Sequence, residues 1–214
     1  MIGSVAVQRI KDGMGFISGT AYDARVLSRL QEAQRDLEKG KTIPEFLLIE
    51  DATAILAAAA HTVAKPTGFM RMKDTERFHF VTSTSDAPVY LTRKYFDDAQ
   101  IAQLRENDDA RAPSVYVIRK SVFDFITTAD IAYTLTYSYY KNADVVALDA
   151  ENLWLANASD WLIGKAGKRL ALDARNKSGV ELFTMLEQEG RAAVFGEDIA
   201  SEDADGPVVM GGEG

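Results

Sequence analysis

The sequence predicts an α+β protein with a helical-bundle body, an inserted antiparallel β-sheet region and an extended C-terminal tail. Apolar residues recur at helical spacing near both ends of the chain, whereas β-branched and aromatic residues concentrate between residues 69 and 146. Residues 197–214 are acidic and rich in glycine. Such a composition cannot bury enough apolar surface to fold alone, which predicts a tail.

These patterns divide the chain into four regions. We expect N-terminal helices of the body over residues 1–50, a strand-rich insertion over 51–148, C-terminal helices of the body over 149–196, and a partner-binding tail over 197–214. With 214 residues, 47% of them hydrophobic, the chain can bury a sizeable core. The absence of cysteine excludes disulfides, thiol catalysis and cysteine-ligated metals.

Two helices are expected before the first proline. Residues 4–13 form a short helix with Gly13 just beyond its end. A second helix begins near Thr20, which resembles a capping box with Asp23, and stops at Gly40. The apolar stripe of this second helix is Val26, Leu27, Leu30, Ala33 and Leu37.

Pro44 disfavours helical geometry for the residue before it, so residues 43–48 are expected to form a buried turn. The alanine-rich residues 53–61 are ambiguous, because their propensity favours helix while a strand-like pattern follows them at residues 69–72.

The middle of the chain reads as an antiparallel sheet with one short helix, over residues 95–104, and an exposed polar loop over 106–112. Its expected strands cover residues 77–81, 89–91, 115–118, 122–126 and 133–140.

Helices return after residue 151. We expect residues 152–155 to be helical and residues 176–179 to form the turn between two longer helices, over 160–175 and 180–195. The predicted apolar face of the first consists of Trp161, Leu162, Ala166, Leu170 and Ala174. That of the second consists of Leu182, Met185, Leu186 and Val194.

Charge is unevenly distributed along the chain. The net charge is −8, but residues 197–214 hold six acidic groups and no Lys or Arg, which leaves −2 for residues 1–196. The sequence shows no clustered cations for gripping phosphates, so we expect DNA to be repelled rather than held. No stretch reaches the length of a membrane span or has the pattern of a signal peptide, so we expect an intracellular protein without membrane contact.

The sequence offers no catalytic constellation. His79 lies between two phenylalanines of a strand and should face the opposite side from them, and His61 has no metal-ligand spacing and is expected in a turn or an interface. Gly13 and Gly15 lack the remainder of a phosphate loop. We therefore predict no catalytic, cofactor-binding or metal-binding residues and no cofactor.

Two further patterns bear on ligand binding. Residues 201–206 resemble the start of a calcium loop, but Ser201 stands at its first ligand position and Gly212 replaces the closing Glu. The aromatic residues of the strand region show no interleaved Lys or Arg in sequence, and Tyr137, Tyr139 and Tyr140 could equally belong to the core or to an interface.

Four sequence words, each a packing pattern rather than a catalytic motif, follow one another in a characteristic order. They are Ile43-Pro44-Glu45-Phe46-Leu47, Lys65-Pro66-Thr67-Gly68-Phe69-Met70-Arg71, residues 132–140 (AYTLTYSYY) and residues 152–162 (NLWLANASDWL). Over about residues 20–196 this order resembles bacteriophage head-to-tail connector (adaptor) proteins of the tail tubular protein A type. The chain departs from that pattern at Ile43, where the family has Leu, and at the additional Leu153.

The resemblance implies that residues 53–60 form a strand, the first arm of a hairpin, against their helical propensity. It also implies packing roles for Pro44, Phe46, Pro66, Phe69, Asn152, Trp154, Leu155 and Trp161. The implied assembly is a non-enzymatic dodecameric ring in the neck or tail of the virion, assembled in the host cytoplasm. The ring would dock on the portal protein, with a tail or nozzle protein on its opposite side, and genome DNA would pass through it without specific binding.

We further hypothesise that Val208, Val209 and Met210 anchor the acidic tail on the portal, because this apolar island needs a partner to be buried. The sequence leaves two alternatives open: a tail-completion or other neck or tail ring protein, and an unrecognised enzyme.

Overall fold

The computed structural model describes residues 1–15, 19–73, 77–82, 87–106 and 109–196. It contains helices and both antiparallel and parallel strand pairs, which confirms the α+β class. The chain divides into two compact units, one formed by Met1–Phe46 with Ala143–Gly214 and the other by Leu47–Asn142. Residues 197–214, with the proposed anchor residues Val208, Val209 and Met210 and the calcium-like residues, lie outside the described residues.

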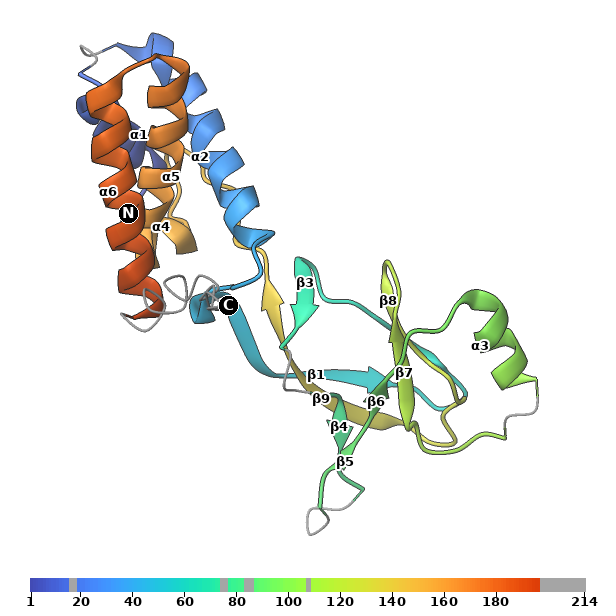
Figure 1. Cartoon of the computed structure of the whole chain (residues 1–214). Coiled ribbons are helices and arrows are strands. Elements are labelled where there is room, and N and C mark those ends of the chain that lie inside the picture. The colour runs from blue at the N-terminus through green and yellow to red at the C-terminus, as the bar shows by residue number, and fades with distance from the viewer. Residues whose placement is uncertain (16–18, 74–76, 83–86, 107–108, 197–214) are drawn as a thin grey trace, which may run out of the picture. The chain divides into compact units, whose positions relative to one another are not determined.

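The first unit consists of helices that pack on one another (Figure 1). Helices α5 and α6 lie side by side, α2 packs on α5, and α1 contacts α2, α5 and α6. The helices are α1 (Gly3–Gly13), α2 (Asp23–Glu38), α4 (Leu153–Asn157), α5 (Ser159–Asp173) and α6 (Lys177–Phe195), with 3-10 turns η1 (Thr20–Tyr22) and η2 (Glu45–Leu47).

The start of α2 differs from the predicted capping box. Residues 20–22 form η1, and the N-cap residue Tyr22 makes no side-chain cap bond. Asp23 instead accepts a hydrogen bond from Lys11 Nζ at 2.7 Å, and the same ammonium group donates to the carbonyl oxygen of Gly19. Because only 5% of the Lys11 side chain is exposed, its charge needs these partners, and Asp23 is drawn away from capping.

The stripe of α2 is confirmed for Val26, Leu30, Ala33 and Leu37, which are buried, while Leu27 is half-buried. Gly13, expected just past the end of α1, is instead its last residue, and Met14 follows as the C-cap. The buried turn after α2 is confirmed by the burial of Ile43, Pro44 and Leu47.

Glycines set the close approach of α5 and α6. A Cβ on Gly164 would lie 2.3 Å from the backbone nitrogen of Glu187, and one on Gly190 would lie 2.1 Å from that of Trp161. At Gly167 a Cβ would meet the ring of Phe183 at 2.4 Å. The two backbones therefore approach more closely than any side chain at these positions would allow.

Gly164, Gly167 and Gly190 are named here the glycine seam. The close approach of the helices at this seam explains why the prediction of the buried face of α6 was wrong. Leu182 and Met185 are 49% and 60% exposed, and Leu186 and Val194 are only half-buried. The large side chain that α6 buries is Phe183, whose ring packs against Gly167. On α5 the predicted Trp161, Leu162, Ala166 and Leu170 are buried, whereas Ala174 lies beyond the helix end and is exposed.

The second unit contains two sheets rather than the single antiparallel sheet expected. One runs β1-β9-β4-β5, with β3 also paired to β9, and the other runs β2-β8-β7-β6, in which β6 and β7 are parallel. The strands are β1 (Leu48–Leu56), β2 (Thr62–Ala64), β3 (Phe69–Met72), β4 (His79–Phe80), β5 (Val89–Tyr90), β6 (Thr92–Arg93), β7 (Val115–Ile118), β8 (Val122–Phe125) and β9 (Tyr133–Lys141).

Strand β1 confirms the choice of strand over helix for the alanine-rich segment, but only up to Leu56. Residues 57–60 form a turn in which Ala59 has a φ of 60°. The expected hairpin is wrong, because β1 pairs with β9 and β2 pairs with β8. The turn directs the chain from one sheet into the other.

Aromatic rings fill the core of the second unit. Phe78 is fully buried, and its ring centroid lies 4.6–5.7 Å from those of Tyr137, Phe123, Tyr116 and Phe125. Burial raises the pKa of Tyr137 to about 12, because ionisation would place a charge in this apolar cluster. The sequence allowed Tyr137 to lie either in the core or in an interface, and the structure places it in the core.

The remaining two tyrosines differ in burial. Tyr139 is 6% exposed and stacks on Tyr137 with ring centroids 5.6 Å apart. Tyr140 is half-buried, with the Arg71 guanidinium 5.6 Å from its ring centroid. Neither tyrosine presents a fully exposed ring.

The expected short helix is confirmed as α3 (Asp98–Arg105), with a capping box between Asp97 and Gln100. Its last residue, Arg105, donates to the buried carboxylate of Asp124 and to the carbonyl oxygen of Phe125. These bonds tie α3 to β8. In the loop that follows, residues 106 and 109–112 are exposed, as expected.

The glycine seam yields a stability prediction. Gly190→Ala should lower the free energy of unfolding by about 1–3 kcal/mol, because the added methyl group must push the two helix backbones apart. Urea unfolding followed by circular dichroism measures the change. Gly19→Ala is the control, because its φ is 175° and a Cβ there meets nothing within 4 Å. Equal stability of the two variants would contradict the seam.

Candidate functional site

The residues of the first and last sequence words meet in the first unit. Phe46, in η2, packs edge-on against Trp154 with ring centroids 5.1 Å apart, and Trp154 packs in the same manner against Trp161 at 5.6 Å. About 100 residues separate Phe46 from Trp154 in the chain. Trp154 is fully buried, so its indole ring is the centre of this cluster.

Asn152 positions Trp154 by capping α4. Its side-chain oxygen accepts from the backbone nitrogens of Trp154 at 2.8 Å and Leu155 at 3.3 Å, and its amide nitrogen donates to the carbonyl oxygen of Asp144. Asn152 and Leu155 are both buried. The asparagine therefore begins the helix and also fixes the segment that returns from the second unit.

A buried carboxylate, Glu38, holds the tryptophan from the other side. Its Oε1 accepts hydrogen bonds from the Trp154 indole Nε1 at 2.9 Å, from Gln34 Nε2 at 2.9 Å and from the backbone nitrogen of Ala143 at 3.2 Å. Gln34 is also buried and exchanges bonds with the backbone of Val146 and Asp144.

Sequence reasoning missed this network. Gln34 and Glu38 are four residues apart and flank the apolar stripe of α2, but a polar pair at such positions is ordinarily solvated. The available signal was their proximity to Leu30 and Leu37 on the helical projection. Only the folded structure supplies the donors that make their burial favourable.

The second and third words meet in the second unit. Phe69 stacks on Tyr139 with ring centroids 5.6 Å apart and meets Phe123 edge-on at 5.2 Å. The preceding Pro66 accepts a backbone bond from Phe69, and Gly68, with a φ of 76°, accepts one from Asn142. These contacts join β3 to the end of β9.

Among the described residues, neither histidine belongs to a cluster of metal-ligating side chains. His61 is exposed and serves through its carbonyl oxygen, which accepts from the backbone nitrogen of Phe125. His79 is half-buried and lies 5.4 Å from the ring of Tyr90, while Phe78 and Phe80 on either side of it are buried, as predicted. In the part of the chain that the structure describes, no three His, Asp or Glu side chains could hold a metal ion.

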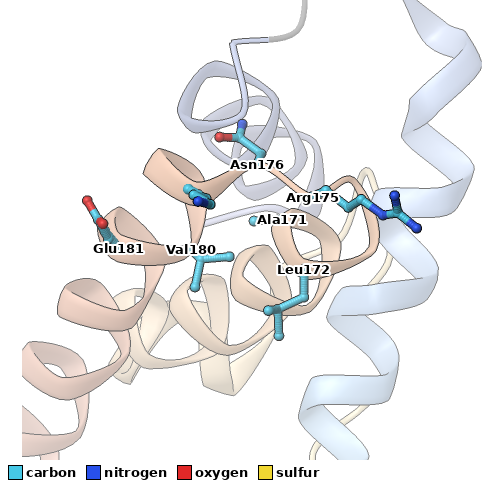
Figure 2. Close-up of a pocket in the computed structure, with 7 residues that line it drawn as sticks. Ala171, Leu172, Arg175, Asn176, Val180 and Glu181 are labelled. Atoms are coloured by element: carbon cyan, nitrogen blue, oxygen red, sulfur yellow. The ribbon is translucent and has the colours of Figure 1, made fainter.

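A shallow depression of about 360 Å³ lies at the turn between α5 and α6. Figure 2 shows Leu172 on one helix and Val180 on the other, with Arg175 and Asn176 in the turn. Glu181 is its one carboxylate, and no histidine lines it. Lys177 and Arg175 also line the depression, and Leu172 is 57% exposed, so the depression continues an exposed apolar surface.

Cations lie among the aromatic rings of the second unit, which the sequence pattern did not indicate. Lys65 Nζ is 4.9 Å from the centroid of Phe69, and the Arg93 guanidinium is 4.8 Å from that of Tyr95. The two contacts lie near β2 and in β6, the two outer strands of the second sheet.

Among the helices of the described residues, none is both long and apolar enough to cross a membrane. No protein-family model matches the chain, and none of the curated proteins does either.

The Glu38 network yields a second stability prediction. Glu38→Leu should lower the free energy of unfolding by about 2–5 kcal/mol, because three buried donors lose their shared acceptor. Urea unfolding followed by tryptophan fluorescence measures the loss. Glu38→Gln keeps one acceptor oxygen and should lose less. Wild-type stability in the leucine variant would show that the network contributes nothing.

Proposed function

We propose that this chain is a structural subunit of a bacteriophage head-to-tail adaptor ring, docked on the portal and lining the DNA channel. The observation that carries the proposal is the meeting of the sequence words that resemble this family. Phe46 from the first word packs on Trp154 from the last, and Phe69 from the second packs on Tyr139 from the third. The residues for which the resemblance implies packing roles are therefore in contact with one another in each unit.

The arrangement of the chain agrees with this role. In the proposal, the helices of residues 1–46 and 143–196 are a helical-bundle body, and residues 47–142 are an insertion that begins at the last residue of η2 and returns before α4. Glu38 and Asn152 both bond the returning segment, at Ala143 and Asp144. A body that holds both ends of its insertion can carry the insertion as a separate contact surface in an assembly.

The helices also leave apolar surface uncovered, which ring formation would bury. Leu172 on α5 and Leu182 and Met185 on α6 are 57%, 49% and 60% exposed, and Val5 on α1 is 46% exposed. Head-to-tail contacts between copies form a closed ring when the rotation from one copy to the next divides a full turn evenly. We propose a dodecamer in the neck of the virion, with portal and tail proteins on its two sides.

The ring is tested by native mass spectrometry of the chain alone and with the portal protein of the same genome. A discrete ring-on-ring complex is expected. Met185→Lys should weaken it at least tenfold, because a charge replaces an apolar contact. Gln188→Lys, at an exposed polar position of the same helix, is the matched control. A chain that stays monomeric and does not bind the portal would overturn the adaptor role. Binding to a tail-tube protein instead of the portal would favour a tail-completion protein.

The tail hypothesis is tested separately by deleting residues 197–214. The truncated chain should keep its circular dichroism spectrum and unfolding transition, because the last helix, α6, ends at Phe195, before the deleted residues. It should lose co-migration with the portal in size-exclusion chromatography. Replacement of Val208, Val209 and Met210 by serine should have the same effect, and undiminished portal binding of both variants would exclude these residues as anchors.

A further inference from the structure

The depression at the turn between α5 and α6 can hold apolar side chains from outside the two helices. Its volume of about 360 Å³ is more than twice the roughly 150 Å³ of an enclosed apolar cavity that admits benzene. Ala171 and Leu172 of α5 and Val180 of α6 supply its apolar lining (Figure 2). Because Leu172 is 57% exposed and Val180 is half-buried, an apolar occupant would remove surface of both helices from water.

Two cations line the same depression. Arg175 and Lys177 are both exposed and stand on either side of Asn176, the N-cap of α6. No carboxylate of the described residues forms an ion pair with either cation. Glu181 also lines the depression, but Figure 2 shows its carboxylate directed away from Leu172. The depression therefore combines an apolar lining with an excess of positive charge.

Residues 197–214 have the complementary composition. They hold six acidic groups and no Lys or Arg, and Val208, Val209 and Met210 form an apolar island among them. Asp205 precedes this island and Glu213 follows it, so carboxylates flank the island on both sides. A segment of this kind can place apolar side chains in the depression while its carboxylates meet the two cations.

The length of chain between α6 and the apolar island matches the distance to the depression. Helix α6 ends at Phe195, with Gly196 as its C-cap. Val180 lies about 24 Å from Gly196 along the helix axis, at about 1.5 Å of rise per residue. A random chain as long as the segment from Gly196 to Val209 has a root-mean-square end-to-end distance of about 20 Å. A tether that matches its span gives a high effective concentration, which favours the depression of the same chain over that of another copy.

We propose that Val208, Val209 and Met210 of the free subunit occupy the depression of their own chain, with Arg175 and Lys177 contacting the neighbouring carboxylates. This docking needs no other protein, so it goes beyond the adaptor role. It has one consequence that rests on that role: the portal must displace the island from the depression before the island can anchor on the portal. Until then the subunit covers its own apolar island.

The contact is tested by disulfide trapping, because the chain has no cysteine of its own. Val180→Cys is combined with Val209→Cys in the full chain, and disulfide formation in a glutathione redox buffer is followed by non-reducing electrophoresis and mass spectrometry. The matched control combines Gln188→Cys with Val209→Cys. Gln188 is exposed on the same helix and lies only about 12 Å from Gly196 along its axis.

Docking in the depression should reverse the order of rates that random encounter gives. Each rate is divided by the rate at which the corresponding single-cysteine variants react with oxidised glutathione. Random encounter favours the nearer Gln188 position, whereas docking should make the Val180 pair form its intramolecular disulfide about tenfold faster than the control pair.

The role of the two cations is tested in the Val180 disulfide pair. Arg175→Gln combined with Lys177→Gln should slow the disulfide about threefold to tenfold, because two attractive contacts with carboxylates are lost. Lys39→Gln combined with Lys41→Gln removes the same charge from exposed positions beyond α2 and should change the rate less than about twofold. Urea unfolding curves establish that each variant is folded.

Three outcomes would overturn the docking: a rate for the Val180 pair no higher than that of the control pair, equal slowing by both pairs of charge substitutions, or disulfides formed mainly between two copies. Addition of the portal protein tests the adaptor role separately, since a competing portal should slow the disulfide. A chain that forms the disulfide but does not bind the portal would keep the docking and overturn the adaptor role.

Discussion

The first unit depends on one buried oxygen atom. Glu38 Oε1 accepts from Gln34 on its own helix, from Ala143 where the chain returns from the second unit, and from the indole of Trp154. An unpartnered carboxylate would be costly at this depth, so the three donors must arrive together. The segments before residue 47 and after residue 142 are thereby assembled as one structure, although 96 residues lie between them.

The contacts of Trp154 continue through aromatic rings and glycines to the other helices of the first unit. Trp154, fixed by Glu38 and by the Asn152 cap, contacts Phe46 and Trp161. The backbone of Trp161 is where α6 approaches most closely, at Gly190. The position of α6 in turn leaves Leu182 and Met185 facing outward. A polar network in the interior thus helps to determine which apolar side chains of the first unit are exposed.

The second unit is held by different means, because several of its strands have only two residues. Such strands contribute few backbone hydrogen bonds, and the aromatic rings around Phe78 and Phe123 pack together in the core between them. The pairing of β6 with β7 also places Arg93 opposite the buried Tyr116.

The sequence by itself determined the α+β class, the helix and strand types of most segments, and the stripe of α2, because periodicity and propensity are local properties. It did not determine that β1 pairs with β9, that the strands divide into two sheets, or that Glu38 is buried. It also misplaced the face of α6, since a hydrophobic pattern cannot show that glycines permit a closer backbone approach around Phe183. These features were decided by the tertiary structure, because each depends on partners far away in the chain.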